Sequence, residues 1–412
     1  MTDDAWTIKR CLDWTQGYLG EHGDERPRLS AEWLLSSVTG LTRTELYMNY
    51  DEPLSPDELA RMHHAVARRA KGEPLQYIAG ETSFRTITVA CEPGVLIPRP
   101  ETEVLVEEVL SYLDREVLGS GSGSPARRRV TLPWNAEVVE ARRREAEETS
   151  RKAAEGREPA PATEDAWDAG GSDGHTVFGA AGDDESFVPV AAESGEQGAD
   201  PEVAEDDVET VASAPAAEDQ MPAKVARTAS VLEVGCGTGC ISLSLATERP
   251  GRVTCIATDI EPKAVVLAER NREALGLSAE EVEFREGNLV APLDRQTEWG
   301  TFDVLVSNPP YVPTSAMATL PREVAAFEPA LALDGGEDGL AIFRRLLNAA
   351  PYMLHEGGLF ACELFEESLD TAKDLCEQAG MGDVRVARDL AGRPRIILAR
   401  VVEAKRYQPQ RA

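Results

Sequence analysis

Long apolar runs are absent from this sequence of 412 residues. No stretch approaches the roughly 18 apolar residues that a membrane-spanning helix requires. The first residues, Met1-Thr2-Asp3-Asp4, lack the basic region that opens a secretory signal peptide. We therefore expect neither membrane insertion nor secretion, and we predict a cytoplasmic protein.

Cysteine and histidine are scarce and scattered. The chain has seven Cys and five His residues, and the cysteines form no Cys-x-x-Cys pair. This spacing argues against a zinc site and against a disulfide framework. We expect no bound metal, and we interpret the cysteines as reduced side chains of the core or of turns.

Lys and Arg are missing altogether from residues 158–223, which contain 18 Asp or Glu residues. The whole chain has a net charge of −31, so this segment carries more than half of the excess. Its few aromatic residues cannot bury enough apolar surface to offset the entropy of ordering. We predict a disordered acidic insertion over residues 119–228 and expect residues 125–222 to be dispensable, because long surface loops cost little free energy. The alternative is an acidic arm that contacts a basic partner or repels nucleic acid.

Composition and periodicity divide the rest of the chain into four parts. A small helical domain, a connector, an α/β domain and a tail are expected at residues 1–72, 73–118, 229–403 and 404–412. After Val231, strand-like and helix-like segments alternate, which is typical of a doubly wound parallel sheet. The last two strand-like segments have no helix between them, so they should pair antiparallel.

Local signals predict three elements in the first 118 residues. Ser55-Pro56-Asp57-Glu58 supplies an N-cap, a proline at the first helical position and a capping-box glutamate. The alternation of apolar and polar residues around Cys91-Glu92-Pro93-Gly94 predicts a hairpin with its connection there. The run from Glu101 to Leu118 is expected to be helical.

The tetrapeptide Asn308-Pro309-Pro310-Tyr311 is the strongest chemical signal. It follows a strand-like run, and ligands of open α/β sheets gather beyond the ends of such strands. Two prolines remove two backbone donors and fix two φ angles, which leaves free carbonyls, a carboxamide and an aromatic ring in one rigid turn. Such a turn suits a planar –NH2 group. The Asn308 side-chain oxygen and the Pro309 carbonyl accept its two hydrogens, and Tyr311 stacks on its plane.

A glycine-rich turn is the second signal. Residues 231–241 are typical of a buried strand, a turn with the spacing G-x-G-x-G and the start of a helix. Glycine there lets the backbone take positive φ angles and approach a ligand closely. Asp259 ends the next strand-like run, where a carboxylate can accept both hydroxyls of a ribose.

In this order the motifs resemble class I S-adenosylmethionine-dependent methyltransferases. Three further stretches, residues 73–84, 95–103 and 327–340, resemble the release factor glutamine methyltransferases (the PrmC/HemK family). The resemblance covers nearly all of the chain except roughly residues 119–228. It implies a Rossmann-like seven-stranded methyltransferase sheet with a reversed last strand and S-adenosylmethionine as methyl donor. The implied substrate is the glutamine in the Gly-Gly-Gln loop of bacterial class I peptide chain release factors. Residues 1–72 contain no catalytic constellation, and a loop on a large protein needs contacts beyond the active site, so we expect this helical unit to dock the release factor.

The predicted site residues fall into two groups. Asn308 and Pro309 are the expected amide acceptors, with Pro310 and Tyr311 completing the substrate turn. The methyl donor is expected to contact Glu233, Gly235, Cys236, Gly237, Thr238, Gly239, Asp259, Asn288, Leu289 and Asn308. The resemblance places the adenine beside Asn288 and Leu289. Relatives often carry Asp where Asn288 stands. The side-chain carbonyl oxygen of Asn288 can still accept from the adenine amino group, but Asn288 adds no negative charge.

Three charged residues have two interpretations each. Glu233 either approaches the methionine ammonium group or only braces the glycine turn. Arg99 and Glu101 either cover the site or form an ion pair or a helix cap.

Three functional interpretations are open. The first is methylation of release factors. The second keeps the chemistry but takes a glutamine of a ribosomal protein, or the adenine amino group of nucleic acid. That last substrate calls for a basic surface, which this acidic chain lacks, so no direct nucleic-acid binding is expected. The third is a non-catalytic adaptor working through its acidic insertion, and the intact Asn-Pro-Pro-Tyr and glycine turns count against it.

Overall fold

The computed structural model describes residues 5–119, 227–389 and 391–406. The predicted acidic insertion lies almost wholly outside these ranges, so its disorder stays a prediction. The end of the predicted tail, residues 407–412, also lies outside them.

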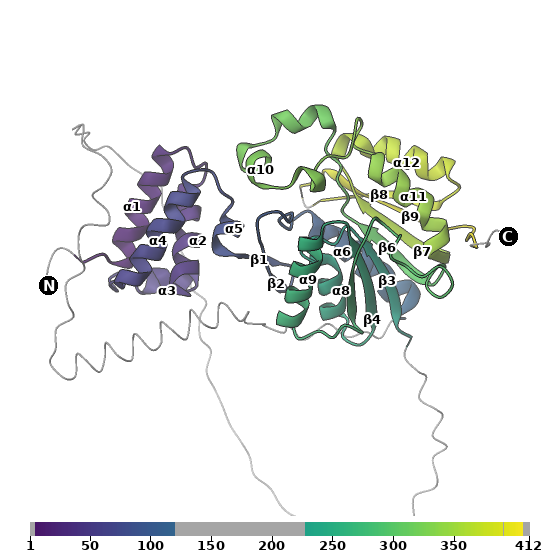
Figure 1. Ribbon diagram of the computed structural model, residues 1–412, viewed down its shortest axis with the longest axis horizontal. Coiled ribbons are helices and arrows are strands. Elements are labelled where there is room, and N and C mark those ends of the chain that lie inside the picture. Colours follow the sequence, from purple (N-terminus) through teal and green to yellow (C-terminus); the bar gives the residue numbers. More distant parts are fainter. Residues whose placement is uncertain (1–4, 120–226, 390, 407–412) are drawn as a thin grey trace, which may run out of the picture. The chain divides into compact units, whose positions relative to one another are not determined.

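The described part of residues 1–72 is helical, as predicted, and one more short helix follows it before residue 80 (Figure 1). These helices are α1 (Ile8–Glu21), α2 (Pro27–Thr39), α3 (Arg43–Met48), α4 (Pro56–Arg69) and α5 (Leu75–Ala79). The capping box that predicts the start of α4 is confirmed: Ser55 Oγ accepts from the Glu58 backbone, and Glu58 Oε2 accepts from the Ser55 backbone at 2.9 Å. These two hydrogen bonds provide acceptors for N–H groups that a helix N-terminus otherwise leaves without partners.

The connector contains a hairpin, but its turn is not where the sequence pattern predicts it. Strands β1 (Glu81–Phe84) and β2 (Ile87–Ala90) pair antiparallel. The connection is therefore the two-residue turn at Arg85, whose φ of 50° is left-handed. Residues 91–94 instead follow the hairpin. A glycine and a proline there suggested a turn, whereas the actual turn has neither, which is why the pattern was misleading. Helix α6 (Thr102–Tyr112) and a π-helical extension, Leu113–Val117, confirm the helix predicted up to Leu118.

A seven-stranded sheet forms the α/β domain, as predicted. Its order is β5-β4-β3-β6-β7-β9-β8. The strands are β3 (Ala229–Val234), β4 (Val253–Asp259), β5 (Val282–Glu286), β6 (Phe302–Ser307), β7 (Leu354–Glu363), β8 (Gly382–Arg388) and β9 (Pro394–Arg400). Only β9 runs against its neighbours, and it pairs antiparallel with both β7 and β8. This confirms both the reversed last strand and the antiparallel final pair.

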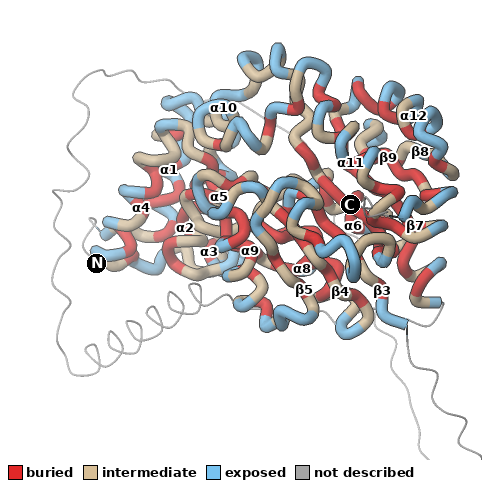
Figure 2. The backbone as a smooth tube through the Cα atoms, turned by 45° about the vertical axis from the view of Figure 1, so that its right-hand side comes forward, coloured by how far each residue is buried: buried red, intermediate tan, exposed pale blue. Residues whose placement is uncertain are grey.

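Helices cover both faces of the sheet (Figure 1). On one face lie α6, α8 (Cys240–Glu248) and α9 (Pro262–Ala274), and on the other lie α11 (Ala341–Met353) and α12 (Leu369–Gln378). Successive strand residues point to opposite faces. Accordingly, Val231 of β3 joins the core under α6 and α8, whereas Leu232 joins the core under α11 and α12. Figure 2 shows these buried strands in the middle of the domain.

Strand β3 lies at the point where the chain changes direction across the sheet. It pairs with β4 on one side and with β6 on the other. In open α/β sheets the ligand crevice opens at the carboxyl ends of the strands at such a point. The glycine turn follows β3, Asp259 ends β4 and the Asn-Pro-Pro-Tyr turn follows β6, so the topology brings them together.

All seven cysteines lie within the described ranges, and all are free and buried, as expected from their spacing. In the part of the chain that the structure describes, no helix has the length and apolarity needed to span a membrane. Across the same residues, no three His, Cys, Asp or Glu side chains are grouped so that they could hold a metal ion.

Candidate active site

A cavity of about 280 Å³ opens at the carboxyl ends of β3, β4 and β6. Its wall brings together most of the predicted site residues, and it also includes the connector residues 94–99. The predicted residues on the wall are Glu233, Gly235, Cys236, Gly237, Thr238, Asp259, Asn288, Leu289, Asn308, Pro309 and Pro310. Two predicted residues, Gly239 and Tyr311, are not part of it.

The glycine turn leaves its backbone open to the cavity. Gly235 and Gly237 have φ angles of 77° and 54°, which side chains other than glycine adopt only with strain. A Cβ atom at Gly235 would meet no protein atom within 4 Å, so the missing side chain leaves room for a ligand. Gly239 serves a different purpose: its Cβ would lie 2.8 Å from the ring of Phe284. It therefore allows α8 to pack closely, and the prediction that it lines the cofactor site is not supported by its position.

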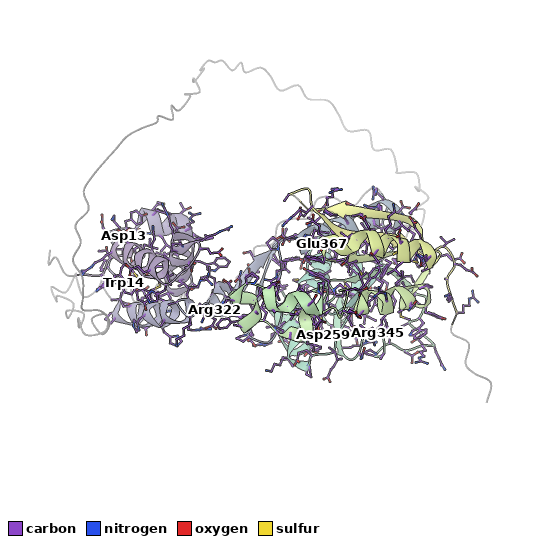
Figure 3. All side chains as sticks on the ribbon, turned by 90° about the horizontal axis from the view of Figure 1, so that it is seen from above. Asp13, Trp14, Asp259, Arg322, Arg345 and Glu367 are labelled. Atoms are coloured by element: carbon purple, nitrogen blue, oxygen red, sulfur yellow. The ribbon has the colours of Figure 1, made fainter. Side chains whose placement is uncertain are left out.

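Asp259 is held by backbone donors at the end of β4. Its Oδ2 accepts from the amide of Gly237 at 2.8 Å, and its Oδ1 accepts from the amide of Glu261 at 2.9 Å. Burial raises the pKa of this carboxyl group, and the backbone hydrogen bonds oppose that shift. The carboxylate of Asp259, which Figure 3 labels, is thereby fixed. Asp259 lines the cavity, and its carboxylate has lone pairs left for hydroxyl groups of a ligand.

Glu233 braces the start of α8, and its contact with a methionine ammonium group stays a prediction. Its Oε2 accepts from the backbone amide of Ser242 at 3.0 Å and from the Ser242 hydroxyl, which ties β3 to α8. Its Oε1 is buried and has no hydrogen-bond partner. Burial raises the pKa of this carboxyl group to about 8. A buried acceptor without a donor is costly, so a cationic donor in the adjoining cavity would stabilise it.

The loop after β5 shapes another part of the wall. Leu289 has a left-handed φ of 53°, and its carbonyl accepts from the Thr258 hydroxyl at 2.8 Å. The Asn288 side chain accepts a hydrogen bond at Oδ1 from Nη2 of Arg345, at 2.9 Å. Arg345 comes from α11 and lines the cavity too (Figure 3). The oxygen that was expected to meet an adenine amino group is thus already engaged by a guanidinium group.

Asn308 is anchored from behind by a chain of hydrogen bonds. Its Nδ2 donates to the hydroxyl of Thr102 at 2.9 Å, and that hydroxyl donates to Oε2 of Glu363 at 2.6 Å. The phenol of Tyr311 donates to the other oxygen of Glu363 at 3.2 Å. Because Nδ2 is used in this way, Oδ1 is the end of the carboxamide left to accept from a ligand.

Tyr311 therefore has a different position from the predicted one. Its ring is half-buried and packs against the core under α11 and α12 rather than on the cavity wall. Burial raises the pKa of its phenol, so the hydroxyl keeps its proton and remains a donor to Glu363. Burial also raises the pKa of Glu363 to about 7, although the hydrogen bonds from Thr102 and Tyr311 oppose the shift.

Arg99 and Glu101 both form ion pairs. Arg99 contacts Glu328 at 2.6 Å, and Glu328 also accepts from the backbone of Ile97 at 3.4 Å. This joins the connector to the segment after α10 (Arg322–Phe327), and Arg99 lines the cavity as well. Glu101 contacts Arg393 at 3.2 Å. The ion-pair interpretation is confirmed for both residues, and whether Arg99 covers a bound ligand stays a prediction.

Sequence reasoning missed three residues of this site: Thr102, Arg345 and Glu363. Thr102 lies inside a stretch that resembles the methyltransferase family, yet nothing in its spacing connects it with Asn308. Glu363 is a charged residue at the end of a strand-like apolar run, and this position in the sequence is the signal that could have identified it. In the structure its side chain is buried. Arg345 lies on an amphipathic helix and gives no such signal.

Both the N-terminal helical region and the α/β domain match models of known protein families. A model of the PrmC N-terminal domain matches residues 10–80, and a model of a methyltransferase domain matches residues 226–390. A release factor glutamine methyltransferase of Geobacter sulfurreducens is 33% identical, over 97% of this chain and 98% of its own length. Proteins of the same name from Moorella thermoacetica and Chlorobaculum tepidum are 31% and 29% identical. They cover 95% and 94% of this chain, and 98% and 95% of their own lengths.

Proposed function

We propose that this chain, which belongs to the release factor glutamine methyltransferase family, methylates a glutamine of bacterial class I peptide chain release factors. The methyl group goes to the side-chain amide nitrogen of the glutamine in the Gly-Gly-Gln loop, and S-adenosylmethionine is the donor. The observation that carries the proposal is the Asn308 carboxamide, which is tied back through Nδ2 and so offers Oδ1 to an amide N–H group. The place of action is the cytoplasm, where release factors meet ribosomes.

The cavity residues suit the parts of S-adenosylmethionine, which supplies an electrophilic methyl group when bound. The open backbone of Gly235 and Gly237 accommodates its close approach. Asp259 would accept from the ribose hydroxyls, and Oε1 of Glu233, which has no hydrogen-bond partner in the protein, would accept from the methionine ammonium group. Asn288 and Leu289 would border the adenine.

The substrate turn compensates for a poor nucleophile. The lone pair of an amide nitrogen is delocalised into the carbonyl, so the nitrogen must be held in line with the methyl–sulfur bond. Asn308 Oδ1 and the Pro309 carbonyl accept its two hydrogens and orient it, and positioning of this kind lowers a barrier by up to about 7–11 kcal/mol. The same acceptors stabilise the positive charge that develops as the nitrogen–carbon bond forms and the carbon–sulfur bond breaks. The nitrogen then loses one proton to water.

The other candidate substrates have less support. Full-length relatives carry the release factor name, which favours release factors over ribosomal proteins. The net charge of −31 opposes binding to a phosphate backbone, and so disfavours adenine in nucleic acid. An adaptor without activity would have no need for an Asn308 side chain held this firmly.

Mass spectrometry of a release factor incubated with the protein and S-adenosylmethionine tests the proposal. We expect one added methyl group, located on the glutamine of the Gly-Gly-Gln loop. The control is a release factor in which that glutamine is replaced by alanine. Label transfer to duplex DNA alongside an unmodified release factor would contradict the proposal.

A further inference from the structure

Behind the substrate turn, Asn308, Thr102 and Glu363 form one directional chain of hydrogen bonds. Thr102 and Glu363 are both buried, with 2% and 1% of their surfaces exposed. They come from the start of α6 and the end of β7, and neither lies in the Asn-Pro-Pro-Tyr turn. The Thr102 hydroxyl has a single proton and can donate to only one neighbour at a time. Its orientation therefore determines the direction in which hydrogen bonds are donated between Asn308, Thr102 and Glu363, which is called the polarity below.

An ionised Glu363 fixes that polarity. A carboxylate only accepts, so Thr102 must donate to it, as it does at 2.6 Å. The Thr102 oxygen then faces Asn308 as an acceptor, and only the Nδ2 end of the carboxamide can donate to it, as it does at 2.9 Å. The carboxamide oxygen is consequently left for the substrate.

A neutral Glu363 removes this constraint. A carboxylic acid carries one O–H donor, and it can donate to Thr102. Thr102 then donates to Asn308, whose carboxamide must turn so that its oxygen faces Thr102. The end that meets the substrate becomes an –NH2 group, which repels another –NH2 group instead of accepting from it.

Several groups on neighbouring elements face Glu363. Thr102 and Tyr311 donate to it, and Glu101 and Arg395 act on it through their charges, Glu101 favouring the neutral form and Arg395 the ionised form. Burial raises the pKa of the Cys240 thiol on α8, and the negative charge of Glu363 raises it further, so this thiol stays neutral. Burial is the largest influence on the carboxyl group and raises the pKa of Glu363 to about 7. Both protonation states are therefore accessible near neutral pH.

We infer that Thr102 and Glu363 are positioning residues that set which end of the Asn308 carboxamide meets the substrate amide. The inference rests on the proposed function and adds a requirement to it. Methyl transfer takes place only from the state in which Glu363 is ionised and Thr102 donates to it. Since that state is lost as the pH falls, turnover falls with it.

The test is the pH profile of kcat at saturating S-adenosylmethionine, measured with a Gly-Gly-Gln peptide and with the whole release factor. For the wild-type enzyme we expect kcat to decline about tenfold per unit below a pH of about 7, because glutamine itself does not titrate. Glu363→Gln should show a lower kcat that no longer depends on pH between about 6 and 8, since its carboxamide can face Thr102 with either end. Glu367→Gln is the matched control, because Glu367 is exposed four residues further along (Figure 3).

Two substitutions at Thr102 separate the hydroxyl from the shape of the side chain. Thr102→Val keeps the shape and removes the hydroxyl, so kcat should fall by about 10²-fold. Thr102→Ser keeps the hydroxyl, so its kcat should stay within a few-fold of the wild-type value. Its kcat should also still decline at low pH, which is the acid limb of the profile. Thr88→Val on β2, at a half-buried threonine, controls for the substitution itself. Calorimetry should show nearly the same S-adenosylmethionine affinity for all these variants.

A wild-type kcat that stays flat from pH 6 to 8 would overturn the inference, and so would an acid limb that persists in Glu363→Gln. Unchanged turnover in Thr102→Val would do the same. In each of these cases the wild-type enzyme still methylates the release factor, so the proposed function survives. An enzyme that binds S-adenosylmethionine but leaves the glutamine unmodified at every pH refutes the proposed function, and the inference with it.

Discussion

Gly339 packs directly against the backbone of Tyr311: a Cβ atom at position 339 would lie 2.4 Å from the Tyr311 carbonyl oxygen. Gly335 makes a similar approach, with its Cβ position 2.8 Å from the carbonyl oxygen of Pro310. The amide of Gly335 also donates to the carbonyl of Val312 at 2.8 Å. The glycine-rich loop before α11 therefore packs against the substrate turn, and this contact explains why positions 335 and 339 hold glycine.

This contact predicts that Gly339→Ala reduces turnover by distorting the substrate turn. Gly380→Ala is the matched control, because Gly380 has almost the same φ (76° against 75°) but open space around its Cβ position. Both substitutions incur about 1–2 kcal/mol of backbone strain in the left-handed region. Only Gly339→Ala should lower kcat, by about tenfold or more, and it should lower the melting temperature further than Gly380→Ala. Similar kcat values for the two variants would show that the contact does not shape the turn.

Asn308→Ala should abolish turnover and leave the binding of S-adenosylmethionine largely intact. The substitution removes the acceptor that holds the amide, and losing one such group typically costs about 10²–10³-fold in kcat. Cofactor affinity, measured by calorimetry, should change little because other residues hold most of that ligand. Asn348→Ala, at an exposed position on α11, is the control. An Asn308→Ala enzyme with substantial turnover would rule out the assignment of Asn308 as the amide acceptor.

Asp259→Ala should act in the opposite way and weaken cofactor binding first. The substitution removes a ribose acceptor and also leaves the amides of Gly237 and Glu261 without their partners. We expect the dissociation constant of S-adenosylmethionine to rise at least tenfold, because each lost charged hydrogen bond is worth about 1.5–3 kcal/mol. Asp374→Ala, on the exposed surface of α12, should leave it unchanged. An unchanged affinity in Asp259→Ala would show that the ribose contact is wrongly assigned.

Arg345 should influence the cofactor through Asn288. Since its guanidinium group holds Oδ1 of Asn288 at 2.9 Å, it orients the carboxamide beside the expected adenine position. We predict that Arg345→Ala and Asn288→Ala each weaken S-adenosylmethionine binding several-fold. The double variant should be no weaker than the worse of the two, because residues in one hydrogen-bonded pair are not additive. Fully additive losses in a double-mutant cycle would mean that the two residues act independently.

Much of the fold could be predicted because its signals are local. The capping box at Ser55 and Glu58 involves residues three apart, and the antiparallel final strands follow from a connection too short for a helix. The place of the site followed from topology, since the carboxyl ends of neighbouring parallel strands must meet. Local pattern and chain direction were enough to bring Asp259 and Asn308 to the same cavity.

The positions that the sequence did not predict depend on tertiary contacts, which no local pattern encodes. Gly239 has the spacing of a ligand-binding glycine, but the ring that it accommodates belongs to Phe284, on another strand. Tyr311 is the last residue of the substrate turn, yet its hydroxyl donates to Glu363, a buried carboxyl group 52 residues later, and not into the cavity. Thr102 and Asn308 are 206 residues apart, so their hydrogen bond is visible only in the folded chain.

The buried carboxyl group of Glu233 predicts how the stability of the cofactor-free protein depends on pH. Burial raises its pKa from 4.5 to about 8, so the folded state holds a proton that the unfolded state releases. Its stabilising contribution is complete below a pH of about 4.5 and is lost as the pH rises towards 8. Glu233→Gln keeps an acceptor for Ser242 and cannot ionise, so it should escape this loss.

The melting temperatures of wild type and Glu233→Gln should therefore diverge between pH 5 and 8. At the upper end the free energy of unfolding of the variant should be larger by a few kcal/mol, because each unit of pKa shift corresponds to about 1.4 kcal/mol. Glu286→Gln, at an exposed glutamate, should follow the wild type at every pH. Adding S-adenosylmethionine should close the gap, because its ammonium group would pair with the ionised carboxylate. Parallel curves without the cofactor would contradict the buried, proton-holding state of Glu233. A gap that the cofactor leaves unchanged would instead remove Glu233 from the ammonium site.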